Sequence, residues 1–98
     1  MPEVSSLQDN ISARLSILGD VAAPDFPDWI AERALRLSLV GRIESSGPDC
    51  LVVAVEGPEA LIDAMELACS LGPASVMVDR IERQRLNGAL QRSGFQIA

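Results

Sequence analysis

The chain has 98 residues, of which 48% are apolar, and its net charge at neutral pH is −6. This length suits one domain with a single core, and the apolar fraction is too high for an intrinsically disordered chain. The acidic balance, with one tryptophan, two phenylalanines and no tyrosine, argues against a nucleic-acid partner, which needs clustered positive charge and stacking side chains. Because no apolar run is long enough to cross a bilayer, we also expect no membrane partner.

Residue types that bind metals or transfer protons are scarce. The chain has no histidine, and its two cysteines, Cys50 and Cys69, are far from any C-x-x-C spacing. We expect both to be free, buried thiols in a reducing compartment, which predicts a cytoplasmic protein. The absence of histidine removes the commonest general base and, with only two cysteines, argues against zinc. We therefore expect no metal and no cofactor.

The beginning of the chain and its charge distribution suggest a simple organisation. Residues 1-10 lack the basic and apolar regions of a signal peptide and are expected to form a mobile tail before one domain over residues 11-98. Residues 80–98 carry a charge of +3, so the rest of the chain is strongly acidic. This basic segment is either a partner surface or a solvated strand face.

The first half of the domain begins with a strand and a helix. Alternating apolar residues predict a strand over 13–17 with one buried face. After an acidic, proline-containing loop, apolar residues at helical spacing predict a helix over 27–37, in which Leu35 widens the apolar stripe. Asp25 or Asp28 is placed to cap this helix.

A hairpin is expected next. Residues 39–44 and 50–56 read as strands, and the Gly- and Pro-containing stretch 45–49 reads as the turn between them. Residues 50–56 are nearly all apolar and rich in valine, which is typical of a central strand that is buried on both sides or has one lightly covered face.

The second half repeats the order of helix and strand. A helix opens at residues 57–59 and ends at Gly72-Pro73, where glycine supplies a left-handed cap and proline prevents continuation. Residues 75–85 read as a strand that is polar on one side and partly exposed, and 95–97 as a last short strand. The predicted inner face of the second helix consists of Leu61, Met65, Ala68 and Cys69.

The predicted order is β-α-β-β-α-β with a short terminal strand. This order is that of the ferredoxin-like α+β sandwich, in which two helices cover one face of an antiparallel sheet. We therefore expect one open sheet face, to which Arg14 and Ser16 contribute.

A series of short features follows this plan in a fixed order: Gly19, Phe26, Ala34, Val40-Gly41, 56–59, Gly72-Pro73, 78–81 and 93–97. In this order and spacing the chain resembles the acylphosphatase family over roughly residues 11 to 98. The resemblance implies the same fold and hydrolysis of acyl phosphates without a metal. Each match is short, and their specificity comes from the series.

The resemblance also implies the position of an active site. In that family a loop of the form Gly-Arg-x-Gln-Gly-Val-x-Phe-Arg wraps phosphate with backbone N–H groups, its last Arg pairs with phosphate oxygens, and an Asn ending the second strand positions the attacking water. The corresponding loop positions here are Asp20, Val21, Ala22, Ala23, Pro24, Asp25 and Phe26. Pro27 stands at the position of the phosphate-binding Arg and Ser45 at that of the Asn.

These replacements remove the groups that the chemistry needs. Arg offers a planar fork that matches phosphate, and each such charged hydrogen bond contributes about 1.5–3 kcal/mol. Losing one transition-state donor costs roughly 10²–10³ in rate. Pro24 and Pro27 lack an N–H, and the aspartates of the loop repel an anion. None of Arg14, Arg33, Arg36 and Arg42 is an obvious substitute, so no catalytic residue is assigned.

Three functions remain open. The first is a non-catalytic binding or interaction module with an unknown protein or small-molecule partner, as a monomer or a weak homodimer. The alternative is a weak or rearranged acylphosphatase. The third possibility is that Asp20, Asp25 and Asp28 bind Ca²⁺ or Mg²⁺, although their spacing matches no known calcium motif.

Overall fold

Five strands and two helices make up the described part of the chain, residues 10–87 and 95–97 of a computed structural model. The strands are β1 (Asn10–Asp20), β2 (Val40–Ser46), β3 (Cys50–Pro58), β4 (Met77–Leu86) and β5 (Phe95–Ile97). The helices are α2 (Phe26–Arg36) and α3 (Glu59–Leu71). The mobile tail predicted for residues 1-10 lies outside the described residues, except that Asn10 is the first residue of β1.

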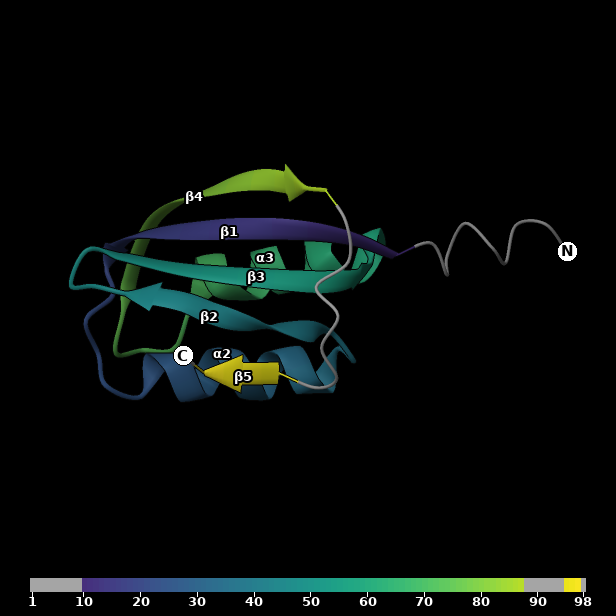
Figure 1. Cartoon of the computed structure of the whole chain (residues 1–98). Coiled ribbons are helices and arrows are strands. Elements are labelled where there is room, and N and C mark those ends of the chain that lie inside the picture. The colour runs from purple at the N-terminus through teal and green to yellow at the C-terminus, as the bar shows by residue number, and fades with distance from the viewer. Residues whose placement is uncertain (1–9, 88–94, 98) are drawn as a thin grey trace, which may run out of the picture.

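The strands form one sheet in the order β4-β1-β3-β2-β5. β1 pairs with β3 and β4, and β2 pairs with β3, all antiparallel. Both helices lie on the same side of this sheet, behind it in Figure 1. The predicted ferredoxin-like plan is therefore confirmed. β5 joins the edge of β2 in parallel, a direction that the sequence pattern does not specify.

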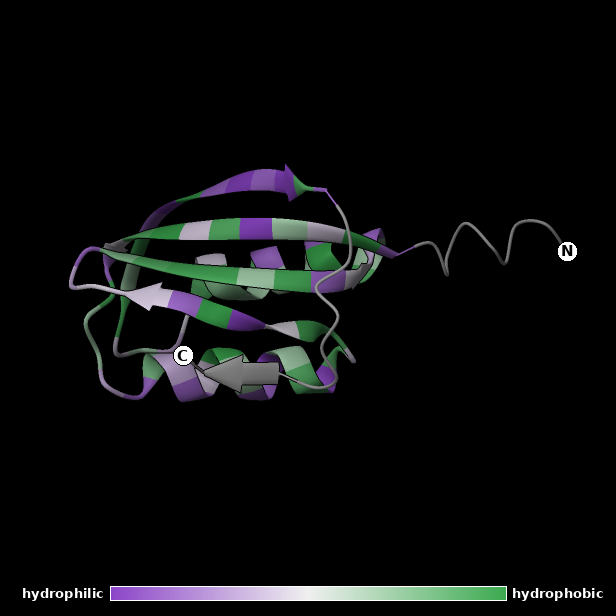
Figure 2. Cartoon of the chain, viewed as in Figure 1, coloured by the Kyte–Doolittle hydropathy of each residue, from purple (hydrophilic) through white to green (hydrophobic). Residues whose placement is uncertain are grey.

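The core lies between the sheet and the two helices. The alternation predicted for the first strand is confirmed, since Ala13, Leu15 and Ile17 are all fully buried. β3 is the central strand, and even Ala54, on the face away from the helices, is buried. Figure 2 shows the contrast between apolar β3 and hydrophilic β4. Because β4 has only one neighbouring strand in the described part of the chain, it needs less apolar surface.

The helices contact the core through faces slightly rotated from the predicted ones. In α2, Phe26, Ile30 and Ala34 are buried, whereas Leu35 is 59% exposed, so only its predicted place in the stripe is wrong. In α3, Ile62 is buried beside Met65 and Cys69, whereas Leu61 and Ala68 are half-buried. Hydrophobic spacing identifies a helix well but fixes the centre of its buried face only to about one residue.

Two strands extend further than predicted at the same end of the sheet. β1 continues through Asp20, and β2 continues through Ser45, so neither residue lies in a loop or turn. The register between β1 and β4 shifts at Leu18 and Gly19. Gly19 has a φ of +147°, and a Cβ there would overlap the carbonyl oxygen of Met77. Glycine at this position therefore allows β4 to approach β1 closely.

No helix of the described residues combines the length and apolar character that a membrane crossing requires.

Candidate functional site at the β1–α2 loop

The topology brings the implied site residues to one end of the sheet. β1 ends at Asp20, next to the start of β3, because Leu18 pairs with Cys50. β2 ends beside the same part of β3, because Ser46 pairs with Leu51. The loop between β1 and α2 and the strand position Ser45 therefore share one end of the molecule.

The backbone of this loop is fastened to the β2–β3 turn. The Gly19 N–H donates to the Asp49 carbonyl oxygen at 3.1 Å, and the Val21 N–H donates to the Pro48 carbonyl oxygen at 3.3 Å. Further along, the Phe26 N–H donates to the Ala23 carbonyl oxygen at 3.1 Å. The amides of Val21 and Phe26 are thus already hydrogen-bonded within the protein.

The carboxylates at and beside the loop face solvent. Asp20, Asp25 and Asp28 are all exposed. Asp25 occupies the N-cap position of α2, but its side chain forms no capping bond, so the predicted role is wrong in that respect. Its two carboxylate oxygens instead accept a hydrogen bond from the Ser75 hydroxyl, at 3.1 and 3.4 Å. This contact ties the loop to the turn before β4.

The geometry does not support the hypothesis that these aspartates bind a cation. Within residues 10–87 and 95–97, no three His, Cys, Asp or Glu side chains come together in a way that suits a metal ion. Asp28 instead lies in the first turn of α2, where a negative charge is favoured by the helix dipole.

Pro27 and Ser45 differ in their surroundings. Pro27 is half-buried in the first turn of α2, where its missing N–H costs no helical hydrogen bond. Ser45 is exposed and pairs with Val52 at an irregularity in the β2–β3 register. Such a bulge changes the direction of the side chain relative to a regular strand.

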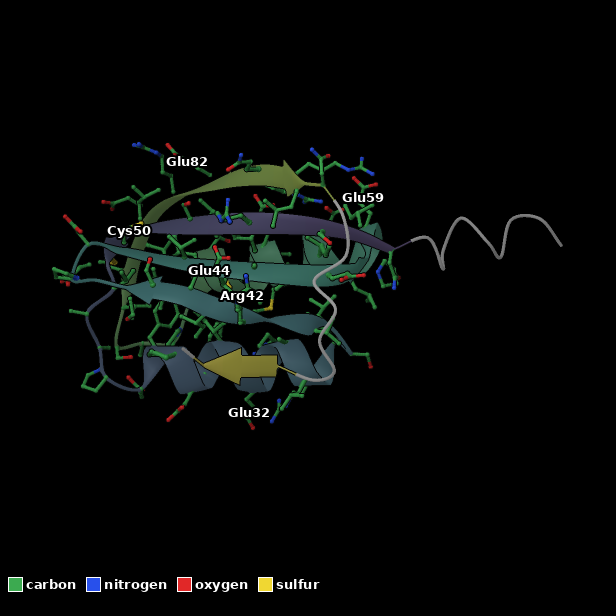
Figure 3. The ribbon with its side chains drawn as sticks, in the orientation of Figure 1. Glu32, Arg42, Glu44, Cys50, Glu59 and Glu82 are labelled. Carbon is green, nitrogen blue, oxygen red and sulfur yellow. The ribbon has the colours of Figure 1, made fainter. Side chains whose placement is uncertain are left out.

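The arginines considered as substitutes are engaged elsewhere. Arg14 pairs with Glu44 at 2.6 Å, and Arg42 pairs with the same carboxylate at 3.3 Å. Figure 3 shows Arg42 and Glu44 side by side on the sheet face opposite the helices. The hydrogen bond from Arg14 holds the pKa of Glu44 below its usual value, against the opposing effect of burial.

The two arginines of α2 also have partners. The Arg33 guanidinium lies over the Trp29 ring, 5.3 Å from its centroid, and Arg36 pairs with Glu32 at 3.1 Å. The Trp29 ring in turn contacts Phe26, with 5.8 Å between the ring centroids.

Arg80 is the residue that sequence reasoning missed. A shallow depression at the loop end of the sheet is lined by Leu18, Gly19, Asp49, Cys50, Asp79 and Arg80. Arg80 reaches this place because β4 pairs with β1, and it also pairs with Glu82 at 3.0 Å. The strand pattern of residues 75–85 suggested an exposed Arg80, but only the strand order places it beside Gly19.

The two thiols have unequal surroundings. Cys69 is fully buried, and desolvation raises its pKa to about 12, although the charge of Arg33 acts in the opposite direction. Cys50 was predicted to be buried, but it is half-buried because it starts β3 at the depression. Both are free, as predicted.

Comparisons of sequence and of fold both find acylphosphatases among the proteins similar to this chain. The chain is 30% identical over 84 residues to an acylphosphatase of Azorhizobium caulinodans, covering 86% of this chain and 90% of the relative. Its fold matches an acylphosphatase of Coxiella burnetii with a TM-score of 0.84 at 16% identity, over 92% of this chain and 94% of that one. The acylphosphatase of Bacillus subtilis gives a TM-score of 0.82 at 19% identity, covering 90% and 98%. No family model matches the chain.

The fold, the order of the elements and these similarities agree. The chain belongs to the acylphosphatase family.

Proposed function

We propose that this family member is a non-catalytic binding or interaction domain. The observation that carries the proposal is the character of the loop at the expected phosphate site. The family pattern implies an arginine at Pro27 and an asparagine at Ser45, and neither proline nor serine can supply a guanidinium or an amide group.

Charge supports the proposal. Asp20, Asp25 and Asp28 are exposed at or beside the loop, and Asp49 is exposed in the turn to which the loop is fastened. A phosphate approaching this region meets like charges, whereas an anion site needs convergent N–H donors and cations.

The hydrogen bonds of the loop support it as well. Pro24 and Pro27 have no N–H, and the N–H groups of Val21 and Phe26 bind carbonyl oxygens of the protein. Fewer amides are therefore left for an anion than a loop of the family form offers.

The alternative is a rearranged acylphosphatase, and Arg80 is the observation that favours it. This guanidinium lines the depression next to Gly19 and is 67% exposed, so it is available to a ligand. Asp49 and Asp79 line the same depression and oppose an anion there. The first function remains the better supported.

Enzyme assays of engineered loops separate these two functions. We expect the parent protein to hydrolyse a small acyl phosphate no faster than a heat-unfolded sample, and the double variant Pro27→Arg with Ser45→Asn to gain turnover. An increase of about 10²-fold or more corresponds to restoring one transition-state donor. Turnover by the parent, abolished by Arg80→Ala, would establish the alternative instead.

Phosphate binding provides an independent readout. A ligand that binds only the folded state raises the melting temperature in proportion to the logarithm of its concentration. We expect millimolar phosphate to leave the parent unchanged relative to chloride at equal ionic strength, and to stabilise the double variant. Selective stabilisation of the parent would contradict the proposal.

A further inference from the structure

β4 is an edge strand of the described sheet. It pairs with β1, and no strand of residues 10–87 and 95–97 lies along its other side. Figure 1 shows β4 as the upper border of the sheet. Such an edge offers a row of backbone N–H and C=O groups to another strand.

The charges of β4 are arranged symmetrically about one apolar residue. The sequence Asp79-Arg80-Ile81-Glu82-Arg83 has opposite charges at equal distances on either side of Ile81. If a second copy of this strand runs antiparallel with Ile81 opposite Ile81, Arg80 of each copy faces Glu82 of the other. Asp79 likewise comes close to Arg83, although Asp79 lies at the β1–β4 irregularity, so the regular pairing involves Arg80 through Glu82.

We propose that β4 is a homodimer interface, in which two copies pair antiparallel about a two-fold axis at Ile81. Neighbouring registers are less favourable, because they place Arg80 opposite Arg80 or Glu82 opposite Glu82. Like charges directly opposite destabilise an antiparallel pair and opposite charges stabilise it. The strand is therefore self-complementary in one register only, as a two-fold interface requires.

Both charged residues are available for such a contact. The side chains of Arg80 and Glu82 are 67% and 60% exposed. They pair with each other within one copy at 3.0 Å, and Figure 3 shows Glu82 pointing away from the sheet at its border. In the dimer each keeps this neighbour and gains one of opposite charge from the second copy.

The helix side of the same edge carries exposed apolar surface. A shallow groove beside Ile81 is lined by Asp63, Glu66, Leu67 and Ser70 of α3. Leu67 is 64% exposed, although it lies next to the half-buried Ile81. The proposed pairing places Ile81 and Leu67 of both copies along one seam, where part of this surface leaves water.

Arg83 reduces the acidity of that seam. It pairs with Asp63 at 2.6 Å, with Glu66 at 3.1 Å and with Glu59 at 3.8 Å. One cation among three carboxylates still leaves this side of each copy negative. The two helices therefore repel each other, which opposes the attraction between Arg80 and Glu82 across the interface, and we expect a weak dimer.

Variants that reverse one charge of β4 test the proposed register of the dimer directly. Sedimentation of the full chain from about 10 µM to about 1 mM should show a monomer–dimer equilibrium, because association follows mass action. Arg80→Glu and Glu82→Arg should each weaken self-association at least tenfold, since each places like charges opposite each other. An equal mixture of the two variants should form a heterodimer, because every facing pair is then opposite in charge.

Controls come from the exposed Arg36–Glu32 pair on α2, which lies away from β4. Arg36→Glu and Glu32→Arg change the net charge by the same amounts and should leave self-association unchanged. In the dimer, hydrogen exchange should show added protection of β4 amides. A concentration-independent monomer, unchanged association of both β4 variants, or failure of their mixture to associate would overturn the proposal, and none of these outcomes depends on hydrolase activity.

Discussion

Glu44 shows how single residues are arranged on the open face of the sheet. Two arginines from different strands, Arg14 on β1 and Arg42 on β2, share this carboxylate. The side chain of Glu44 is only 20% exposed, and the arginines are 35% exposed. The cluster links β1 and β2 across β3, which lies between them.

This cluster predicts a pH dependence of stability. Since the folded-state pKa of Glu44 is lowered, its contribution is fully present above the unfolded pKa and is lost as the pH falls through the folded value. We expect Glu44→Gln to lower the melting temperature at pH 7, and the difference from the parent to shrink below about pH 4, the ordinary range for glutamate. Thermal unfolding at both pH values measures this.

The control for this prediction is Glu32→Gln, which removes an exposed pair within α2. Exposed pairs of this kind contribute little to stability, so it should have a smaller effect at pH 7. An equal loss in both variants would show that Glu44 has no special role.

Among the elements, β1 and β4 depend on one backbone conformation. Gly19 has a positive φ, and a side chain there would overlap the backbone of β4. We expect Gly19→Ala to lower the free energy of unfolding by about 1–3 kcal/mol, the range for a strained backbone residue. Denaturant unfolding followed by far-UV circular dichroism measures the loss.

Gly47→Ala is the matched control for this change. A Cβ at Gly47 meets only the Cys50 carbonyl oxygen, at 3.4 Å, which is nearly an ordinary contact. This variant should unfold close to the parent midpoint. If both alanine variants were equally stable, the close approach at Gly19 would not restrict this position.

The elements also show what the sequence can and cannot predict. The valines of β3 and the Gly72-Pro73 helix stop depend on local chemistry, so the order of helices and strands along the chain could be predicted. The continuation of β1 through Asp20 depends on distant partners, since Asp20 pairs with Met77 of β4 and the Gly19 N–H donates to the Asp49 carbonyl oxygen. The position of Arg80 beside the loop depends in the same way on the pairing of distant strands.

The position of the candidate site could be predicted from the sequence, but the contacts of its side chains could not. Its position at the end of the first strand followed from the family resemblance, and the structure places the loop and Ser45 at one end of the sheet. The partner of Asp25 could not be inferred, because Ser75 is 50 positions away in the chain and lies beside Asp25 only in the folded structure.

On the scale of the whole molecule, chemical modification of the two thiols should require different degrees of opening of the structure. Cys50 is half-buried and Cys69 is fully buried, with its pKa raised to about 12. Since the thiolate is the reactive form, we expect a thiol reagent to modify Cys50 in the native protein and Cys69 only when the core opens. Mass spectrometry over time, on peptides cut after glutamate, distinguishes the two sites, because Glu56, Glu59 and Glu66 lie between them.

A comparison of variants checks this assignment. The modification rate of Cys69 should rise in the destabilised variant Gly19→Ala, because its core opens more often. Equal rates at both thiols in the parent would contradict the difference in burial.

The indole of Trp29 is the only one in the chain, and it lies one helical turn after the loop, against Phe26 and under Arg33. Its emission is therefore an intrinsic optical signal from this end of the protein. Small molecules can be screened against the loop by fluorescence without attaching a dye.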